Sequence, residues 1–310
     1  MKRLGGVTRM IGVASSLLLV TACSTGSGSG GDDSPPPPQP VSAKEYATML
    51  TGALGPLDKA LDGLATANAY KGLDDRVSAV ETATRQAADK LTPVQPPAEL
   101  SSQHTQLVAA LQAFEKEVGG VGEQINDRVT CTGGAVRADL GDAKATAGLR
   151  AAIGAAVARL PGTKIAVSLP AADQQVDARP SNGKLLRSRG LDGEGLLTID
   201  NGGSSDAVVT ITKGRKPTAA VYVRKGKQYT VKEIPDGTYA VFFTGGTDWD
   251  GKARAFGHKC AFQKFDQSLG FRTTRTTTQT FYQTYRITLQ PVAGGTAKTD
   301  QVDPDRYPNE

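Results

Sequence analysis

The sequence predicts a mixed α+β protein in which a helical half is followed by a β half. Between residues 42 and 160, apolar side chains recur at alternating spacings of four and three, which is typical of one buried face of an amphipathic helix. From residue 190 onward, short β-branched and aromatic runs alternate with turn residues. A chain of 310 residues is long enough for two domains. We therefore expect an antiparallel four-helix bundle over residues 42–162, followed by an all-β sandwich over residues 190–295.

Four helical segments of similar length are expected in the bundle. The first three carry clean apolar stripes, whereas the fourth, over residues 136–160, is rich in alanine and less regular. Short connections between such helices favour antiparallel packing. A kink is expected in the first helix at Gly55-Pro56, because proline lacks a backbone donor and its ring collides with the preceding turn. The predicted breaks between helices are Gly72, then Pro93 with Pro96 and Pro97, then Gly133 with Gly134.

Six runs in the β half have the length and composition of strands. They are LLTIDN, DAVVTIT, TAAVYVR, QYTVKEI, TYAVFFT and YRITLQPV. Turn residues separate most of them at intervals of about 8 to 12 positions, which is typical of an antiparallel sandwich or barrel. Residues 163–189 are expected to be a linker with a candidate short strand at 165–169. Residues 296–310 are expected to be a polar tail that extends loosely.

The N-terminal segment has the layout of an export signal. Three basic residues come first, an apolar run covers residues 11–20, and the small residues Thr21 and Ala22 stand before Cys23. The apolar run is about half of the ~20 residues that a membrane-spanning helix needs. We therefore expect residues 1–22 to be a cleaved signal peptide.

The stretch Val20-Thr21-Ala22-Cys23 resembles the lipobox of bacterial lipoproteins. The resemblance implies cleavage before Cys23 and a diacylglyceryl group, carrying acyl chains such as palmitate, on its thiol. Two acyl chains are enough for stable anchoring, at roughly 0.8 kcal/mol per buried methylene. The mature chain would then be held by lipid on the outer face of the cell membrane. The alternative is a soluble secreted protein in which this cysteine is incidental.

Cleavage would also change the charge and expose a tether. Residues 1–22 hold three basic and no acidic residues, so their removal lowers the formal net charge from +5 to +2. The basic character of the full chain is thus no indication of nucleic-acid binding. Residues 23–41 are rich in Gly, Ser and Pro, a composition typical of a flexible and partly extended tether.

A second resemblance is carried by four stretches of the β half and two of the helical half. In the β half they are NGGSSDAVVTIT, VYVRKGK, PDGTYAVFFTGGTDWD and ARAFGHKCAF; in the helical half they are KGLDD and QPPAEL. The β half resembles a C-terminal domain of many exported bacterial proteins whose function is uncharacterised. The helical half is similar to lipoproteins of actinobacteria that carry the same pairing. These resemblances imply an architecture and a cellular location, and no activity.

The cysteine count predicts a disulfide. If Cys23 carries lipid, Cys131 and Cys260 remain as an even pair in an oxidising compartment. A bond between them would join the two halves by closing a loop of roughly 130 residues, worth about 5 kcal/mol in the chain-entropy model. The alternatives are two buried free thiols, or one reactive cysteine.

The two histidines give no metal site. His104 lies in register with the apolar stripe of the third helix, so we expect it to be packed in the core. His258 stands two residues before Cys260, a spacing that could supply two zinc ligands. A second Cys/His pair that would complete a tetrahedral set is absent from the sequence, so no metal and no cofactor is expected.

One acidic pair could carry chemistry. Asp248 and Asp250 flank the single tryptophan, Trp249, and such a pair could bind calcium or act as an acid and a base. The calcium-loop pattern fails, because Lys259 occupies the position that needs a glutamate. We expect a loop whose Trp packs on the sheet edge and whose acids are solvated. An envelope hydrolase using Asp248, Asp250 and His258 is the less favoured alternative, so no catalytic residue is assigned.

The β half is basic. Residues 189–295 hold 15 basic and 9 acidic residues. Such a surface could favour an anionic wall polymer or lipid headgroups, unless its lysines are only solvated turn residues. Consecutive turns of a meander emerge at opposite ends of a sheet, so the two basic turns need not form one patch. They contain Lys213, Arg215 and Lys216 in the first and Arg224, Lys225 and Lys227 in the second.

Together these patterns predict a lipid-anchored protein of the cell envelope that binds rather than catalyses. The expected partner is an anionic wall polymer or another envelope protein. Aromatic residues are too sparse around the basic turns for a nucleic-acid stacking platform. The alternative is a carrier of an apolar ligand, which requires an apolar pocket of several hundred Å³.

Overall fold

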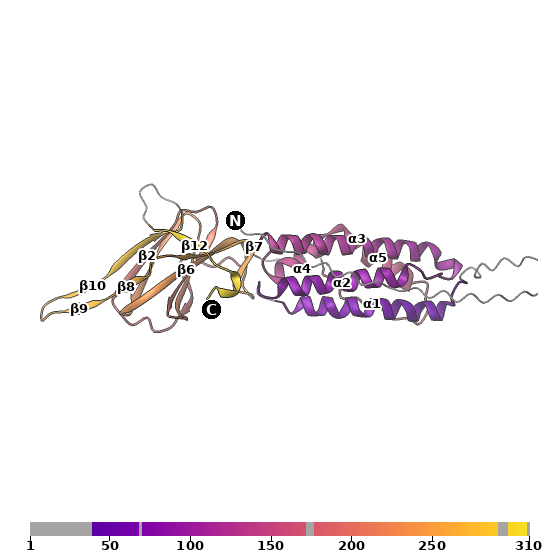
Figure 1. The fold of residues 1–310 in the computed structure, drawn as a ribbon, viewed down its shortest axis with the longest axis horizontal. Coiled ribbons are helices and arrows are strands. Elements are labelled where there is room, and N and C mark those ends of the chain that lie inside the picture. Colours follow the sequence, from indigo (N-terminus) through magenta and orange to yellow (C-terminus); the bar gives the residue numbers. More distant parts are fainter. Residues whose placement is uncertain (1–38, 68–69, 172–176, 291–296, 309–310) are drawn as a thin grey trace, which may run out of the picture. The chain divides into compact units, whose positions relative to one another are not determined.

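The computed structural model describes residues 39–67, 70–171, 177–290 and 297–308. It confirms the mixed α+β class, since α-helices come first along the chain and β-sheets follow (Figure 1). The two halves belong to one compact unit. The predicted signal peptide, the predicted lipidation site Cys23 and all but the end of the predicted tether lie outside the described residues.

Three long helices occupy the first three predicted helical segments. They are α1 (Ala43–Ala65), α2 (Leu73–Leu91) and α3 (Ser101–Asn126), the last preceded by the short 3-10 helix η1 (Ala98–Leu100). α1 begins in a capping box, in which the Ser42 side chain accepts from the N–H of Glu45 and the Glu45 carboxylate accepts from the N–H of Ser42. It then continues through Pro56, the site of the predicted kink. The apolar stripes of the helices form one buried core, with α2 against both α1 and α3.

His104 lies in this core, as predicted. Its side chain is nearly buried, and its Nδ1 shares a hydrogen bond of 2.9 Å with the hydroxyl of Tyr46 on α1. Burial lowers the pKa of His104 and raises the pKa of Tyr46 to about 12. Both side chains are therefore neutral near pH 7, which suits an apolar interior.

The segment expected to form the fourth helix is divided in two, so that prediction was wrong. α4 (Gly133–Asp142) and α5 (Lys144–Val157) are separated by Ala143, whose backbone is extended with ψ of 135°. The Thr132 side chain caps α4 by accepting from the N–H of Ala135 at 3.2 Å. Gly and Asp at the C-terminal end of α4 have low helix propensity, which favours a break at that point.

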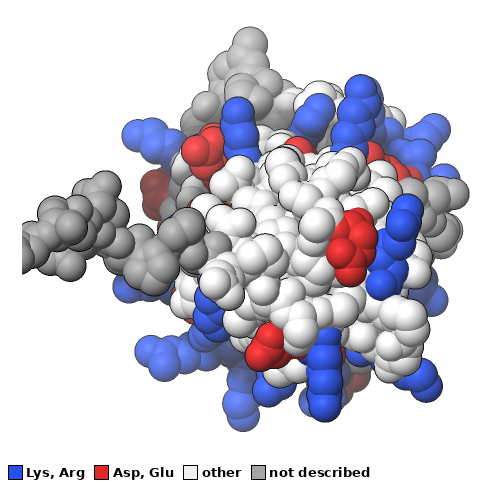
Figure 2. Space-filling model, turned by 90° about the vertical axis from the view of Figure 1, so that its right-hand side faces the viewer, with Lys and Arg blue, Asp and Glu red and all other residues white. Residues whose placement is uncertain are grey.

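The end of the helical half that lies away from the β half has an uncharged centre. Figure 2 looks onto this end, and Lys, Arg, Asp and Glu lie mainly around its rim. The chain enters the helical half here, because the N–H of Val41 donates to the carbonyl oxygen of Gln95 in the α2–α3 connection at 2.9 Å. That connection, residues 92–97, contains no charged residue. No described helix combines the length and the apolar character that crossing a bilayer requires.

The β half contains three sheets among the described residues. The largest has the strand order β1-β4-β3-β6-β7-β12, with β8 also paired to β6; the second has the order β11-β2-β5; the third is the hairpin of β9 and β10. The described strand pairs of the β half are antiparallel, as predicted, except that β11 runs parallel to β2. The strands are β1 (Lys184–Ser188), β2 (Gly195–Asn201), β3 (Asp206–Lys213), β4 (Lys216–Val223), β5 (Lys227–Ile234), β6 (Gly237–Asp250), β7 (Ala255–Phe265), β8 (Leu269–Phe271), β9 (Thr273–Arg275), β10 (Thr280–Tyr282), β11 (Thr284–Thr288) and β12 (Thr299–Gln301).

Apolar clusters cover both faces of the largest sheet. On one face, Val209 and Val241 pack with Leu197 of the three-stranded sheet. On the other face, Tyr222 and Trp249 form a smaller aromatic cluster. Because successive side chains of a strand point to opposite faces, β3 contributes to both clusters and nearly all of its residues are buried.

The β half extends beyond the predicted range of residues 190–295. β1 lies within the predicted linker, and β12 and the 3-10 helix η2 (Pro304–Arg306) lie within the predicted tail. The tail does not extend loosely, because β12 pairs with β7 and Tyr307 packs against the rings of Phe242 and Phe262. The candidate strand at residues 165–169 is not formed.

Candidate functional site at the junction of the two halves

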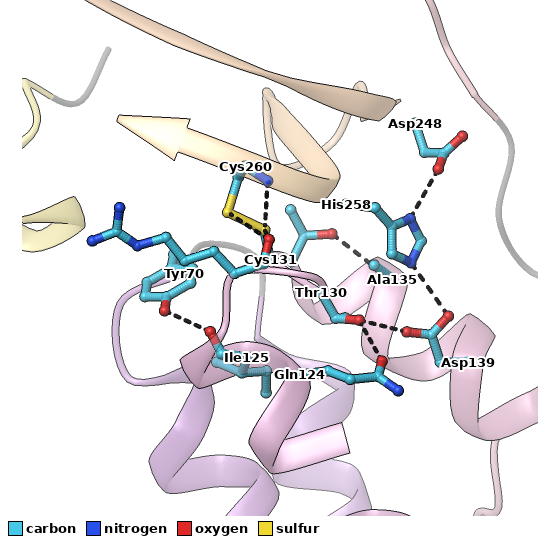
Figure 3. The surroundings of a disulfide bond; sticks show 12 residues. Tyr70, Gln124, Ile125, Thr130, Cys131, Ala135, Asp139, Asp248, His258 and Cys260 are labelled. Carbon is cyan, nitrogen blue, oxygen red and sulfur yellow. Dashed lines mark hydrogen bonds and ion pairs between the residues drawn. A yellow bond between two sulfur atoms is a disulfide. The ribbon is translucent and has the colours of Figure 1, made fainter. Parts of the chain in front are cut away.

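The predicted disulfide between Cys131 and Cys260 is present. Cys131 stands in the connection between α3 and α4, and Cys260 stands on β7, so the bond joins the helical half to the β half (Figure 3). Both cysteines are buried. The prediction from the cysteine count is therefore confirmed.

Backbone hydrogen bonds run beside the disulfide. Residues 128–131 pair with residues 257–260 in the manner of a short strand added to β7. The bonds run from the N–H of Cys131 to the oxygen of Gly257 (2.7 Å), from the N–H of Lys259 to Val129 (2.9 Å) and from the N–H of Cys260 to Arg128 (3.1 Å). Arg128 and Lys259 have left-handed φ angles of 60° and 51°, a conformation that costs a non-glycine residue of order 1 kcal/mol or more. The junction holds this strained backbone in place.

His258 on β7 lies between two carboxylates at the junction. Its Nδ1 is 2.9 Å from Oδ2 of Asp248 on β6, and its Nε2 is 3.3 Å from Oδ1 of Asp139 on α4 (Figure 3). The hydrogen bond with Asp139 raises the pKa of His258, and Asp248 adds to this effect, while burial alone would lower it. A protonated ring can donate to both carboxylates at once.

The network continues into the helical half. The hydroxyl of Thr130, which is fully buried, lies 2.8 Å from Oδ2 of Asp139 and 3.0 Å from Oε1 of Gln124. Thr130 also forms a backbone bridge with His258. Five polar side chains from both halves, those of Asp248, His258, Asp139, Thr130 and Gln124, are thus linked beside the disulfide.

At the predicted helix break, Gly133 and Gly134 lie very close to the segment after α1 and to β6. A Cβ at Gly133 would lie 2.0 Å from the carbonyl oxygen of Ala67, after α1, and a Cβ at Gly134 would lie 2.4 Å from Oδ2 of Asp250 on β6. Such distances are far below van der Waals contact, so a side chain at Gly133 would require the backbone at Ala67 to move, and one at Gly134 would displace the Asp250 carboxylate. The first turn of α4 therefore packs tightly against both halves.

The hydrolase cluster considered from the sequence is only partly assembled. Asp248 and His258 converge, but the Asp250 carboxylate accepts from the N–H groups of Lys252 and Ala253 in the β6–β7 turn. The prediction that Trp249 lies in a loop is wrong, because this residue is buried within β6. Both nitrogens of His258 are engaged with carboxylates, one from each half of the chain.

A second ionic cluster was missed by the sequence reasoning. Asp206 at the start of β3 is nearly buried and accepts from Arg179 at 2.5 and 2.8 Å, from the Tyr222 hydroxyl at 2.6 Å and from the N–H of Lys225 at 2.7 Å. Burial alone would raise the pKa of Asp206, but these hydrogen bonds lower it to about 2. Arg179 belongs to the predicted linker, where nothing in the sequence marks it as a partner of a strand 27 residues away.

The structure separates the six basic turn residues into two groups at opposite ends of β4. One group flanks the β3–β4 turn and the other flanks the β4–β5 connection. A strand of eight residues is about 23 Å long at ~3.3 Å per residue. The first group is Lys213, Arg215 and Lys216, and the second is Arg224, Lys225 and Lys227.

Two of these side chains are used inside the protein. Nζ of Lys213 donates to the carbonyl oxygen of Asp236 at 3.0 Å and lies over the ring of Tyr239. Nε of Arg224 donates to the carbonyl oxygen of Pro180 at 2.8 Å. The basic turns therefore serve the fold at least in part and do not form one patch.

The hairpin of β9 and β10 is an exposed surface that the sequence reasoning did not single out. Phe281 and Tyr282 on β10 are 55% and 45% exposed. Residues 267–290 contain arginines and no acidic residue. At the base of the hairpin, the Asp236 carboxylate accepts from the N–H and the hydroxyl of Thr273 at 2.9 and 2.8 Å. An anchored hairpin thus presents two aromatic side chains to solvent, while its Arg275 pairs with Glu194 at 3.1 Å.

In the part of the chain that the structure describes, no three His, Cys, Asp or Glu side chains are grouped so as to hold a metal ion. No family model matches the chain, and the curated proteins and solved structures likewise contain no match to it.

Proposed function

We propose that this chain is an exported bacterial lipoprotein, of the kind found in actinobacteria, that is anchored through Cys23 to the outer face of the cell membrane and binds another envelope protein. The disulfide between Cys131 and Cys260 supports this location, because disulfides persist in oxidising compartments and are rare in the cytosol. It also accounts for two of the three cysteines, which leaves Cys23 for the lipid.

The location has a direct test. Mass spectrometry of the mature protein should find an acylated Cys23 at the N-terminus and no residues 1–22. The variant Cys23→Ser should leave the membrane fraction. An unmodified Cys23, or a retained signal segment, would refute the lipid anchor.

We infer that the two halves are a helical bundle and a β-sandwich. A single apolar core shared by all five described helices supports the bundle, whose last helix is the divided pair of α4 and α5. A cluster with side chains from both the largest sheet and the three-stranded sheet supports a sandwich. Aligned sheets about 10 Å apart would be expected in a crystal structure.

The β9–β10 hairpin is the observation that carries the binding role. Aromatic residues and arginine are enriched at the energetically dominant positions of protein interfaces. Phe281 and Tyr282 lie exposed on a hairpin that also contains Arg275. Arg275 is paired with Glu194 at 3.1 Å and Arg286 with Asp200 at 2.8 Å, so the exposed rings of Phe281 and Tyr282, and not a free positive charge, carry this proposal.

A protein partner is favoured over an anionic wall polymer by the placement of the basic turns. The two groups lie about 23 Å apart along β4, and Lys213 and Arg224 are bonded within the fold. A non-catalytic role is supported by His258, whose nitrogens both face carboxylates of the protein itself.

The experiment uses the full lipidated chain in native membranes. A photo-crosslinking amino acid is placed at Phe281, and a matched one at Met49 on α1, which is also exposed. The proposal predicts a discrete protein adduct from position 281 and none from position 49. The adduct should fall at least fivefold in Tyr282→Ala, the loss expected when about 1 kcal/mol of interface energy is removed.

Other outcomes would contradict a protein partner. Lipid adducts from position 281 would instead identify the hairpin as a membrane contact. The protein could also be retained on purified wall polymer and lose this retention only when both basic turns are neutralised. That result would favour the polymer as the partner. Equal adducts from positions 281 and 49 would show collision without specific binding.

A further inference from the structure

We infer that a pocket at the junction of the two halves is a binding site for a small aromatic acid. The pocket has a volume of about 300 Å³ and is lined by five separate parts of the chain. These are the α1–α2 connection, Cys131 of the α3–α4 connection, the largest sheet, the β6–β7 turn and the C-terminal segment. The volume equals that of about ten water molecules and lies at the lower end of the range for small-molecule sites. This inference is independent of the proposed protein partner, which involves the distant end of the β half.

Aromatic rings form the walls of the pocket. Phe262 of β7 has its ring centre 6.1 Å from that of Tyr70 and 5.3 Å from that of Tyr307, both in edge-to-face geometry. Phe256 closes another side. Rings arranged in this way offer faces and edges that complement a further flat ring. An aromatic ligand therefore fits the walls better than a flexible chain.

The tyrosine hydroxyls are used elsewhere. The Tyr70 hydroxyl donates to the carbonyl oxygen of Ile125 at the end of α3, at 2.7 Å (Figure 3). The Tyr307 hydroxyl lies 3.5 Å from Oγ1 of the buried Thr210. Because these oxygens have partners in the protein, the rings present mainly carbon to the pocket.

The charge at the pocket selects the sign of the ligand. The lining residues include Lys71 and Arg254, and none of the described ones is Asp or Glu; the guanidinium of Arg254 donates to the carbonyl oxygen of Leu186, which leaves Lys71 to meet a ligand. Lys71 is exposed, so its ammonium can meet a charged group at the mouth. A ring that bears one carboxylate would satisfy both the apolar walls and the ammonium of Lys71.

The site depends on the C-terminal segment, which carries Pro304 and Tyr307 into the wall. This segment is held by the pairing of β12 with β7 and by the packing of Tyr307 on Phe242, whose ring centres are 6.0 Å apart. The polar composition of residues 296–310 had predicted a loosely extended tail. Its docking is what turns the face of β7 into a cavity.

The test uses the disulfide-bonded full chain in detergent with two probes, 1-naphthoate and the uncharged 1-naphthalenemethanol. Isothermal titration calorimetry should give saturable binding of naphthoate with a stoichiometry of one. Ala255→Phe on β7 fills the pocket and should weaken this binding at least tenfold. Ala261→Phe, on the same strand but exposed and outside the lining, is the matched control and should leave it unchanged.

The charge is tested separately. Lys71→Gln should weaken the binding of naphthoate by about two- to fivefold, the range of an exposed ion pair. The binding of the uncharged probe should not change. Lys59→Gln on α1 is the exposed control and should change neither.

NMR cross-peaks in the unsubstituted chain locate the ligand even if the Ala255→Phe variant does not fold. Contacts from naphthoate protons to the rings of Tyr70 and Tyr307 are expected. Contacts only to other residues, the absence of saturable binding, or undiminished binding in a folded Ala255→Phe protein would each overturn the inference.

Discussion

Nε2 of His258 on β7 lies 3.3 Å from Oδ1 of Asp139 on α4, so one hydrogen bond joins a titratable group of the β half to a carboxylate of the helical half. The partners are 119 residues apart in the chain. Since Asp248 faces the other ring nitrogen, the protonated form of His258 is favoured. The charge of this ring therefore influences how firmly the two halves are joined.

The pKa values of the two histidines should differ from the usual value of 6.5 in opposite directions. The hydrogen bond with Asp139 raises the pKa of His258, whereas burial lowers the pKa of His104. The sequence holds no other histidine, so two ring signals in an NMR titration report these sites directly. Asp139→Asn should lower the higher pKa and leave the lower one in place. Two midpoints that coincide near 6.5 would contradict both assignments.

His258→Gln should destabilise the protein by about 1 kcal/mol at low pH and by less at high pH. A group whose pKa is raised on folding stabilises the folded state fully below its unfolded pKa of 6.5, and this contribution fades as pH rises through the folded pKa. Urea unfolding of both proteins from about pH 5 to 9 measures the gap. If the difference in unfolding free energy between the two proteins grew as pH rose, the pKa of His258 would have to be lowered on folding, which contradicts the prediction.

Gly133→Ala and Gly134→Ala should each lower the free energy of unfolding by about 1–3 kcal/mol, the usual cost of overpacking. Their Cβ atoms would collide with the Ala67 carbonyl oxygen and the Asp250 carboxylate. Gly148→Ala on α5 is the control, because its Cβ would meet nothing within 4 Å. That control should instead stabilise by about 0.5–1 kcal/mol through helix propensity. Equal effects at all three positions in thermal unfolding would exclude close approach as the cause.

Asp206→Asn should destabilise the protein by about 2 kcal/mol near pH 7, because the hydrogen bond with Arg179 would lose its charge. With a pKa lowered to about 2, Asp206 stabilises the folded state above the ordinary carboxyl value of 3.8 and ceases to do so as pH falls through 2. The two proteins should therefore converge in stability in strong acid. Chemical unfolding at neutral and acidic pH checks this. Asp200→Asn, at the more exposed pair with Arg286, is the control and should cost below about 1 kcal/mol.

Replacing Cys131 and Cys260 together by serine should lower the free energy of unfolding by about 3–5 kcal/mol, because a long closed loop is opened. Reduction of the natural protein should give a similar loss in urea unfolding. Cys23→Ser is the matched control and should leave stability unchanged. A loss below about 1 kcal/mol would mean that the backbone pairing of residues 128–131 already holds the halves together.

Local patterns in the sequence predicted part of this structure. The stripe that includes His104 placed that residue in the core, since a helical period is a property of neighbouring residues. The cysteine count predicted the bond between Cys131 and Cys260, because so few pairings were possible. Strand composition located β2 to β6 with fair accuracy. The divided fourth helix was missed because an alanine-rich segment has little periodicity to read.

The candidate sites depend on contacts that have no local signal. Asp139 meets His258, and Arg179 meets Asp206, only because the fold brings distant segments together. The tail residue Tyr307 has a polar sequence around it, and its burial depends on a groove between the rings of other strands. No periodicity or motif could have predicted these pairs.

The crosslink between Cys131 and Cys260 also decides which parts of the chain would bear a mechanical load. Under a pull between the point of entry at residue 41 and the hairpin beginning at residue 273, the shortest covalent path runs to Cys131, across the disulfide and on from Cys260. Residues 132–259 lie off this path, so their backbone cannot be pulled out to its full length while the bond is intact. α4, α5 and strands β1 to β6 are thereby shielded from extension, and the covalent path runs through the long helices, residues 260–265 of β7 and β8.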